Sequence, residues 1–548
     1  MTTIRRLTAL LAVPALCAAV LGCRPTPPPT GTGAAPASGP GAADTAAGDK
    51  TLTLAWVYQI DTLDPAKAYI LPSWDTDRSL YEGLLDYDLN SLDLRPAAAE
   101  GYDVSDDGTV YTFHLKPDLK FSDGTPVTAQ DFRYAWMRVL DPKTASPGAQ
   151  FFTGIVGAQD YLDGKATDVP GIEVPDPRTL KVTLVQPDLA FANIVAMNFA
   201  FPLPKKAVED LGDKWGTAEL VGNGRYMLSE WRKGELIVLK RNPSYAGDPP
   251  KIDEIRYILG QESPAIVQRF EAGEVDILQD VPPGDFTRLQ QDPKYQDCWV
   301  SMQQGAVRYL CMNVEEKPFG NIKVREAVAH AVNKERLIKL MNGRAVVANG
   351  VFPPTLPQFN PDLKAPDYDL EKSKALLAEA GLPDGFRTDM YYYQEETRQK
   401  LAEAIQSDLA AVGIKVTLRP VQREVFANEA GIAHKYPFMI AEWYQDYPDP
   451  SNYLDVLLHS RQVRAQASNN FARYKNPKVD AVIDEARAEA DPQKRTELYR
   501  EAEEIAMADV PWVPLHHEKA YILHQPNVTG VTLHPVSWIR LELVDKKG

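Results

Sequence analysis

The segment RTDMYYYQEETRQKLAEAIQSDLAAVGIKVTL, residues 387–418, decides the fold class of this chain. Residues 387–393 have the aromatic-rich pattern of a strand, and residues 395–412 repeat apolar side chains at helical spacing before Gly413. Residues 414–418 then alternate as a second strand does. A strand, a helix and a strand in this order predict a βαβ unit, so we expect the two strands to be parallel.

The same alternation continues along the chain and predicts an α/β protein. Strands are expected at 51–57, 111–115, 180–184 and 436–440, and helices at 77–85, 129–140, 322–341, 370–380, 478–489 and 492–508. Thr128 and Asp131 predict a capping box at the start of the second of these helices. A body of about 500 residues has room for about three structural units.

Residues 1–22 have the pattern of an export signal, with a basic start and an apolar run at 7–20 that is too short to span a bilayer. Val20-Leu21-Gly22-Cys23 resembles a bacterial lipobox, so we expect Cys23 to become the lipidated N-terminus. An ordinary secretory signal with a chance cysteine is the alternative. Pro, Gly and Ala make up 18 of the 26 residues from 24 to 49, and this composition predicts a disordered tether.

Composition and motifs exclude several classes of protein. With 75 acidic and 59 basic residues the net charge is −16, so we expect no non-specific binding to nucleic acid. The chain lacks H-E-x-x-H, G-x-S-x-G and the P-loop motif. His516 and His517 would point to opposite faces of a strand and would chelate a metal poorly. We therefore expect no enzyme, no metal site and no cofactor.

Two cysteines, Cys298 and Cys311, remain after the signal and the lipobox. If Gln304-Gly305 is a two-residue turn, these cysteines face each other across a hairpin. An exported compartment permits a disulfide there, so a Cys298–Cys311 bond is predicted. Two buried free thiols are the alternative.

The segment AEWYQDYPDP, residues 441–450, contains the main candidate site. It follows an expected buried strand and places Asp446 among Trp443, Tyr444 and Tyr447. A carboxylate buried among aromatic rings is costly unless a cation meets it. We therefore expect a positive partner for Asp446, which is either a ligand or an internal Arg or Lys.

A longer segment, FSDGTPVTAQDFRYAWMRVLDP at 121–142, closely resembles the signature of the oligopeptide-binding family of ABC transporter solute-binding proteins. Further similar stretches follow in the family's order over residues 50–520. They are LDP (63–65), SLYEGLL (79–85), NGRYML (223–228), RNPSY (241–245), GEVDIL (273–278), VREAVAHAVNKERL (324–337) and ALLAEAGLPDGF (375–386).

The resemblance implies a two-lobe periplasmic-binding-protein fold of type II, with an extra domain and with discontinuous lobes joined by a hinge. The first lobe would comprise residues 50–82, 206–305 and 521–548. The extra domain would comprise residues 83–205, and the second lobe residues 306–520.

The resemblance also implies roles for individual residues. In peptide-binding members the acid of the 441–450 motif binds the ligand's α-ammonium, and Asp446 occupies that place. The backbone of 441–444 and the loop 69–72 would flank an extended peptide as added strands. The stretch before this motif, residues 431–435, contains no arginine for the peptide carboxylate. Arg398 could substitute, with an exposed helix arginine as the alternative. The candidate ligand-binding residues are Tyr69, Ile70, Leu71, Tyr134, Arg398, Ala441, Glu442, Trp443, Tyr444, Asp446, Tyr447 and Glu518.

The function implied is that of an exported, lipid-anchored and monomeric receptor that captures oligopeptides and delivers them to an ABC permease. Three alternatives stay open at this point. The first is a receptor of the same family for a sugar or a metal chelate. The second is an exported hydrolase, which would need a nucleophile–base pair. The third is a chaperone or a signalling receptor.

Overall fold

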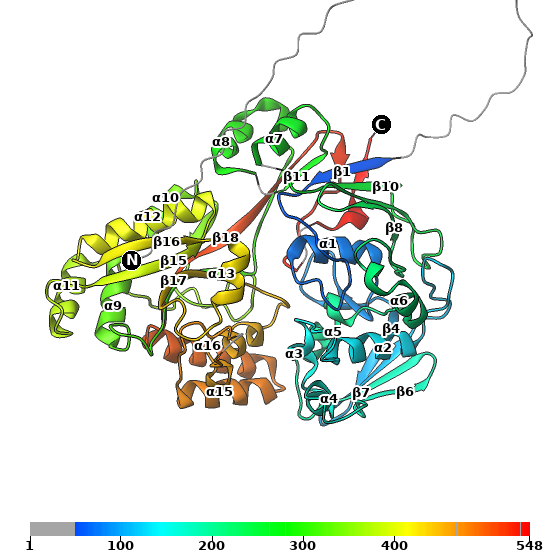
Figure 1. Cartoon of the computed structure of the whole chain (residues 1–548), viewed down its shortest axis with the longest axis horizontal. Coiled ribbons are helices and arrows are strands. Elements are labelled where there is room, and N and C mark those ends of the chain that lie inside the picture. Colours follow the sequence, from blue (N-terminus) through cyan, green and yellow to red (C-terminus); the bar gives the residue numbers. More distant parts are fainter. Residues whose placement is uncertain (1–49, 262, 280, 466–467, 537–538, 548) are drawn as a thin grey trace, which may run out of the picture. The chain divides into compact units, whose positions relative to one another are not determined.

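The computed structural model describes residues 50–547 except 262, 280, 466–467 and 537–538 (Figure 1). The predicted signal, Cys23 and the predicted tether lie outside the described residues. The chain divides into residues 1–48 and 49–548, and the second unit holds every element named below. No helix in this described part is long and apolar enough to cross a membrane.

The predicted βαβ unit is confirmed. Strands β15 (Arg387–Tyr393) and β16 (Lys415–Val421) are parallel neighbours, and helix α12 (Glu396–Ala410) connects them. Leu401 and Ile405 of α12 share one buried core with Met390 and Tyr392 of β15. The helix therefore covers one face of this sheet with the apolar side that its sequence period predicts.

Around this unit lies the half of the large sheet that we call the second lobe. Its other strands are β13 (Ala306–Met312), β14 (Ala345–Val347) and β17 (Phe438–Tyr444). Its other helices are α9 (Ile322–Ala331), α10 (Lys334–Leu340), α11 (Leu370–Glu379), α13 (Arg423–Glu429), α14 (Leu454–Leu457), α15 (Pro477–Ala488) and α16 (Pro492–Ala508). Alternate residues of β17 enter two cores, Phe438 and Ile440 on one face and Met439 and Ala441 on the other. This burial of both faces explains the continuous apolar sequence of the strand.

The other half of the sheet is called the first lobe here. It contains β1 (Thr51–Ala55), β8 (Tyr226–Arg232), β9 (Leu236–Arg241), β10 (Glu254–Ile258), β11 (Ile277–Gln279) and β12 (Trp299–Gln303). Its helices are α1 (Leu71–Leu80), α6 (Lys205–Leu211), α7 (Ser263–Glu271) and α8 (Pro283–Gln291). Strand β1 is parallel to both β10 and β11.

One long strand, β18 (Trp512–His524), joins the two halves into a single twelve-stranded sheet (Figure 1). It pairs with β13 and β14 in one part of its length and with β11 and β12 in the other. The lobe boundary predicted at residue 520 therefore falls inside a continuous strand.

The extra domain is built on a separate antiparallel sheet in the order β4-β5-β7-β6. Its strands are β4 (Ala99–Val104), β5 (Val110–Leu115), β6 (Ile172–Asp176) and β7 (Thr179–Thr183), and its helices are α2 (Ala129–Leu140), α3 (Ala149–Phe152), α4 (Ala158–Leu162) and α5 (Phe191–Val195). The remaining strands form two small sheets, β2 (Leu85–Tyr87) with β3 (Leu94–Pro96) and β19 (Val528–Thr529) with β20 (Asp545–Lys546). The capping box of α2 is confirmed, because the Asp131 carboxylate accepts from the backbone N–H and the hydroxyl of Thr128 at 2.7 and 2.8 Å.

Two predicted helices are wrong in their bounds. The predicted helix 322–341 is two helices, α9 and α10, because the Asn333 side chain accepts from the backbone N–H of Arg336 and starts a new helix. The helix predicted at 77–85 is α1, which begins six residues earlier. Pro72 lies in its first turn, where a missing N–H costs nothing.

The predicted hairpin and disulfide are also wrong, since Cys298 and Cys311 are buried free thiols. Strand β12 does not fold back on β13. Trp299 lies opposite Leu523, and Cys311 lies opposite Trp512 further along the same strand β18. The twelve residues between the two cysteines thus run on in one direction, over roughly 40 Å at the rise of an extended strand. Disulfide geometry needs Cα atoms within about 7 Å of each other.

Candidate functional site

Asp446 lies just beyond the end of β17 and is the centre of the candidate site. Its side chain is buried, with 8% of the residue exposed. Oδ1 accepts from the Tyr69 hydroxyl at 2.9 Å, and Oδ2 accepts from Nδ2 of Asn452 at 3.0 Å. Among the described residues no Arg, Lys or His forms an ion pair with it. The structural ion pair considered as an alternative is therefore absent from this part of the chain.

The charge on Asp446 is consequently not compensated by a cation of the described residues. Burial raises the pKa of Asp446 to about 6, although the hydrogen bonds from Asn452 and Tyr69 act in the opposite direction. A buried carboxylate can accept about four hydrogen bonds, and two are used here. The site is thus suited to a cationic donor that brings the missing positive charge.

Near Asp446, the side of β17 that faces β15 has no strand partner within the described chain. Within the described chain, β15 pairs with β17 only where Tyr391 lies opposite Met439, whereas β13 pairs with β17 along its whole length. Residues 441–444 therefore have no partner on the β15 side among the described strands. Such an edge can accept an extended chain as an added strand.

Glu442 lies four residues before Asp446 and is already paired. Its carboxylate contacts the guanidinium of Arg308 at 2.8 Å and that of Arg398, and it accepts from the Tyr393 hydroxyl at 3.1 Å. Burial pushes the pKa of Glu442 upward, but Arg308 and Arg398 outweigh that effect and lower it overall. Glu442 is therefore a partly buried anion held by two arginines.

Arg398 is 1% exposed, so it is not the exposed helix arginine of the alternative interpretation. Its guanidinium stacks on Tyr393, with 3.5 Å from Cζ to the ring centroid. Nε and Nη1 have no hydrogen-bond partner among the described residues. The structure thus shows a buried cation with one anionic partner and two unused donors.

Glu518, which is partly buried, and Tyr444, which is 39% exposed, extend this group of charges. Glu518 pairs with Arg308 and accepts from the Tyr444 hydroxyl at 2.7 Å, while His516 Nε2 lies 3.6 Å from it. Burial opposes the charge of Glu518, but Arg308 holds its pKa well below the usual range. The cluster therefore connects β13, β17 and β18 through charge, where the two halves of the sheet meet.

Other predicted residues lie in different places. Tyr447 is buried, and its ring meets Phe151 of the extra domain edge-on at 6.1 Å between centroids. Leu71 starts α1 and so cannot supply the strand-like backbone predicted for 69–72, whereas Ile70 keeps an extended backbone. Tyr134 lies on α2, half-buried against the shared core of the first lobe and extra domain, with Arg138 and Glu209 as its charged neighbours.

Three residues of the site were not predicted from the sequence. Asn452 holds Asp446, and Arg308 joins Glu442 to Glu518. Arg423 of α13 lies over the rings of Tyr58 and Tyr393, at 4.7 and 5.2 Å from their centroids. The only signal that sequence offers for Arg308 is a charged residue within an otherwise apolar strand.

Comparison with known proteins now identifies the family. A model of the bacterial extracellular solute-binding proteins, family 5 (middle region), matches residues 93–465. The chain belongs to this family. The resemblance seen in the sequence is therefore confirmed.

Individual family 5 proteins match over almost their whole length. The periplasmic oligopeptide-binding protein of Salmonella typhimurium is 33% identical over 499 residues, which cover 86% of this chain and 88% of the relative. The structure of the Escherichia coli murein tripeptide binding protein has a TM-score of 0.79 at 29% identity, covering 91% of this chain and 99% of that one. The Haemophilus influenzae oligopeptide-binding protein in complex with RPPGFSPFR has a TM-score of 0.78 at 28% identity, covering 91% and 99%. The two-lobe α/β fold is confirmed by these neighbours.

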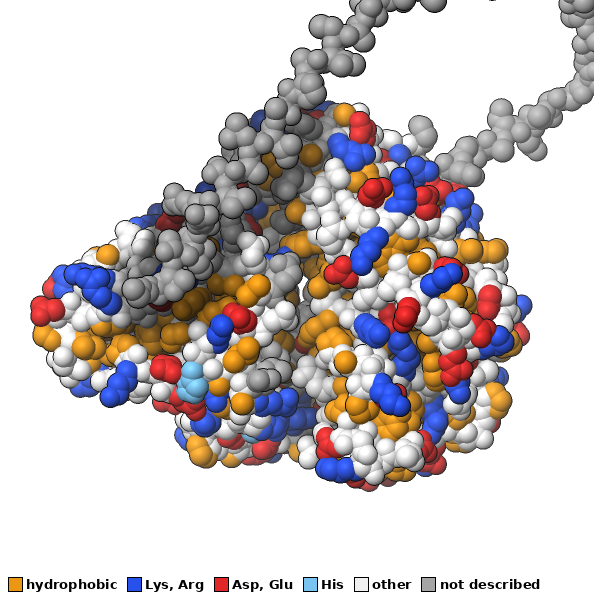
Figure 2. All heavy atoms as spheres, in the orientation of Figure 1, with side chains coloured by type: hydrophobic (Ala, Val, Ile, Leu, Met, Phe, Trp, Pro, Cys, Tyr) orange, Lys and Arg blue, Asp and Glu red, His pale blue; other side chains and the backbone are white. Residues whose placement is uncertain are grey.

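Charge on the visible face of this family 5 protein is mixed. Figure 2 shows Lys and Arg side chains interspersed with Asp and Glu, and no large area of one sign. On this face the coloured side chains form no positive stripe of the kind by which proteins bind the phosphates of nucleic acids.

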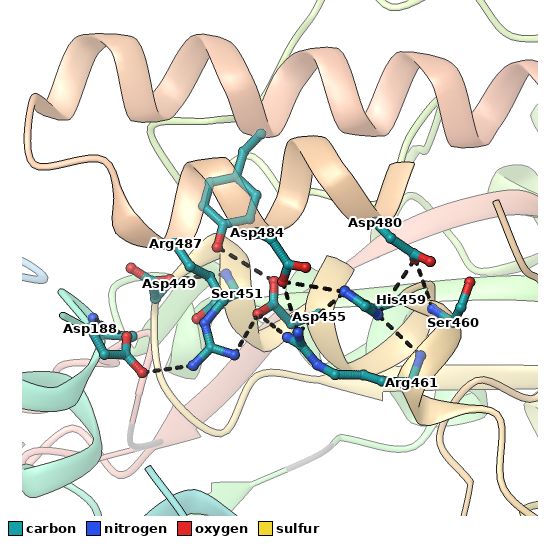
Figure 3. A network of polar contacts seen from close by, with 12 residues as sticks. Asp188, Asp449, Ser451, Asp455, His459, Ser460, Arg461, Asp480, Asp484 and Arg487 are labelled. Atoms are coloured by element: carbon teal, nitrogen blue, oxygen red, sulfur yellow. Dashed lines mark hydrogen bonds and ion pairs between the residues drawn. The ribbon is translucent and has the colours of Figure 1, made fainter. Parts of the chain in front are cut away.

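A second group of charged residues joins the second lobe to the extra domain (Figure 3). Arg487 of α15 contacts Asp188, which lies between β7 and α5, at 2.9 Å. On its own side Arg487 lies 3.3 Å from Asp455, and Asp455 lies 3.0 Å from Arg461. Arg487 is therefore held from the second lobe while it reaches the extra domain.

We expect Arg487→Ala to loosen this contact between the lobes of a family 5 protein. A partly buried ion pair contributes about 1 kcal/mol. Its loss should lower the ratio of molecules in which the second lobe contacts the extra domain to those in which it does not by roughly fivefold. Spin labels at Lys165→Cys and Lys400→Cys would report the distance distribution in ligand-free protein. Arg461→Ala is the matched control, because its partners Asp455 and Asp484 both belong to the second lobe. Identical distributions for Arg487→Ala and the unsubstituted protein would contradict the prediction.

Proposed function

We propose that this chain is the extracytoplasmic substrate-binding protein of an ABC importer, and that it captures short peptides by their α-ammonium group. The observation that carries the proposal is Asp446, a buried carboxylate whose described hydrogen-bond partners, Tyr69 and Asn452, are both uncharged. A peptide brings the cation that this site lacks. The relatives include oligopeptide- and tripeptide-binding proteins, which agrees with this ligand class.

The open edge of β17 supports an extended ligand next to Asp446. Main-chain hydrogen bonds from residues 441–444 would hold the peptide backbone with little demand on its sequence. Trp443, Tyr444 and Tyr447 would line the side-chain pockets, and Tyr69 with Ile70 would approach from the first lobe.

The peptide carboxylate would be bound at the level of Glu442, which lies in β17 four residues before Asp446. An extended chain rises about 3.3 Å per residue, so a peptide of about four residues would span from Asp446 to the level of Glu442. Arg398 has two unused donors at that level, and Arg423 lies beside it over Tyr393. We propose these arginines as the partners of the carboxylate.

The remaining parts of the proposal rest on the sequence. Cys23 would anchor the mature protein by lipid at the cell membrane, and residues 24–49 would tether the folded body outside the cytoplasm. The division into 50–82, 206–305 and 521–548, with 83–205 and 306–520, describes the proposed lobes and extra domain. The protein would act as a monomer, without a cofactor, and would dock on the permease subunits.

The test is native mass spectrometry of the protein purified from its own host, followed by calorimetry with trialanine and tetraalanine. We expect co-purified masses that fragment as short peptides, and binding that N-acetylation of the same peptides abolishes. A retained sugar, metal chelate or other ligand without an amine would overturn the proposal. So would equal affinity for free and acetylated peptides.

The pH dependence of binding follows from the state of Asp446. Its pKa of about 6 in the ligand-free protein means that it becomes neutral below this pH and loses its attraction for an ammonium. Peptide α-amino groups lose their proton near pH 8. Affinity should therefore be greatest between about pH 6 and pH 8 and fall on both sides, as measured by calorimetry across this range. Affinity that stays constant down to pH 5 would contradict the prediction.

The same pKa has a consequence for stability with the opposite sign. The pKa of Asp446 is higher in the folded protein than the value of 3.8 for an exposed carboxyl. The ligand-free fold should therefore lose stability as pH rises from about 4 through 6, and bound peptide should restore it.

A further inference from the structure

Asn452 stands six residues after Asp446 in the short helix η4 (Pro450–Asn452), and its side chain is completely buried. The loop between them is held by Asp449, which accepts from the backbone N–H of Ser451 and from two nitrogens of Arg495. Asn452 N also donates to the Asp449 carbonyl at 3.0 Å. The chain after β17 is therefore folded back so that Asn452 meets Asp446.

The Asn452 amide makes three hydrogen bonds, and together they determine its orientation. Oδ1 accepts from the backbone N–H of Asp446 at 2.8 Å and from the indole N–H of Trp443 at 3.2 Å. Both groups can only donate, so the amide oxygen must face them. Nδ2 is then directed at Oδ2 of Asp446, at 3.0 Å.

We propose that Asn452 is the positioning residue of this site, which holds the Asp446 carboxylate in place and in its charged form and so sets the pH range for binding an α-ammonium. The inference rests on the proposed function. It adds a residue that acts through its hydrogen bonds to Asp446.

Two features distinguish Asn452 from the other donor to Asp446. Tyr69 belongs to the first lobe and is 37% exposed, so its bond depends on how the lobes meet. Asn452 and Asp446 lie in one loop of the second lobe, so their bonds do not depend on the first lobe. A charge-assisted hydrogen bond favours the ionised form of a carboxyl group, and here it opposes the effect of burial.

The other titratable groups that face Asp446 do not change charge near neutral pH. They are the phenols of Tyr69 and Tyr453, and burial raises the pKa of each well above its ordinary value. Tyr447, the next residue in the chain, has a raised pKa for the same reason. A titration seen at this site between pH 4 and pH 9 can therefore be assigned to Asp446.

The decisive variant is Asn452→Asp, which has the same shape. It keeps the oxygen that accepts from Asp446 N and Trp443 but replaces the donor by a second carboxylate oxygen. Two carboxylates about 3 Å apart share one proton, so the midpoint for Asp446 should rise by at least about one pH unit. The measurement is the ¹³C NMR titration of the Asp446 carboxyl carbon in ligand-free protein.

Two further variants complete the design. Asn452→Ser removes the amide without adding charge, so it should raise the midpoint less than Asn452→Asp does. It also tests the inference if Asn452→Asp does not fold. Tyr69→Phe removes the other donor and should also raise the midpoint while leaving the orientation of Asp446 unchanged. A midpoint that stays unchanged in both Asn452 variants would overturn the inference.

The second arm measures trialanine affinity against pH for the same proteins. The pH below which the affinity falls should rise together with the NMR midpoint of each variant. One outcome is that the midpoint rises while the pH at which affinity falls stays the same. In that case Asp446 is not the ammonium site, and both the binding part of this inference and the proposed function fail. If neither moves, the positioning role alone is overturned, since wild-type binding is unaffected by that result.

Discussion

Replacing Asp446 by Asn should lower the affinity for a short peptide by roughly two to four powers of ten. Truncating one member of a buried charged pair costs about 3 to 5 kcal/mol, because the partner is left in a dry site without compensation. The side chain is buried, and the described residues offer it no cation of their own. In the proposed complex, the peptide ammonium would therefore lose the carboxylate that binds it.

A double comparison isolates this contact. N-acetylation of the peptide removes the ammonium and should harm binding to the unsubstituted protein by a similar factor. The two losses should not add, because each breaks the same interaction. Calorimetry on the unsubstituted protein and on Asp446→Asn, each with trialanine and acetyl-trialanine, measures all four affinities.

The matched control is Asp408→Asn, another buried acid of the second lobe, which pairs with Arg336 and lies ten residues after Arg398 in helix α12. It should leave peptide affinity unchanged. If acetylation weakens binding to Asp446→Asn as much as to the unsubstituted protein, Asp446 does not bind the ammonium.

The largest expected effect on stability comes from Glu442→Gln. This change keeps the shape of the side chain but removes the negative charge that lies between Arg308 and Arg398. Arg308 retains Glu518, whereas Arg398 is left buried with no anion among its described partners. We expect the free energy of unfolding to fall by about 3 to 5 kcal/mol.

Urea unfolding followed by tryptophan fluorescence checks this value. The control Glu371→Gln removes an exposed acid that pairs with Lys374 within one helix, and it should change stability by less than about 0.5 kcal/mol. A loss below about 1 kcal/mol for Glu442→Gln would mean that water or a local rearrangement compensates Arg398.

The sequence could predict those parts of the fold that local patterns specify. Strand β15 and helix α16 have the predicted bounds, and Thr128 with Asp131 forms the predicted capping box. The βαβ unit followed for the same reason, since a helix of this length between two strands leaves little choice but a parallel pair. The predicted start of α1 is wrong because proline occurs both in loops and in the first turn of helices. The sequence pattern assigns Pro72 to a loop, but it lies in the first turn of α1.

For the candidate site, the sequence by itself determined that Asp446 needs a positive partner, because an acid among three aromatic side chains at the end of a buried strand is costly when unpaired. Only the tertiary structure decided which residues surround it. Tyr69 reaches Asp446 from a position 377 residues away in the chain, and Arg398 lies opposite Glu442 at a separation of 44. The course of β12 and β13 was decided in the same way. A hairpin and a straight continuation share one alternating pattern, and the choice between them depends on β18, which lies more than 200 residues later. Hydrophobic period, capping and the pairing within one βαβ unit depend on neighbouring residues. Strand partners and charge pairs that are distant in the chain are selected by the whole fold, so they cannot be predicted from the sequence around them.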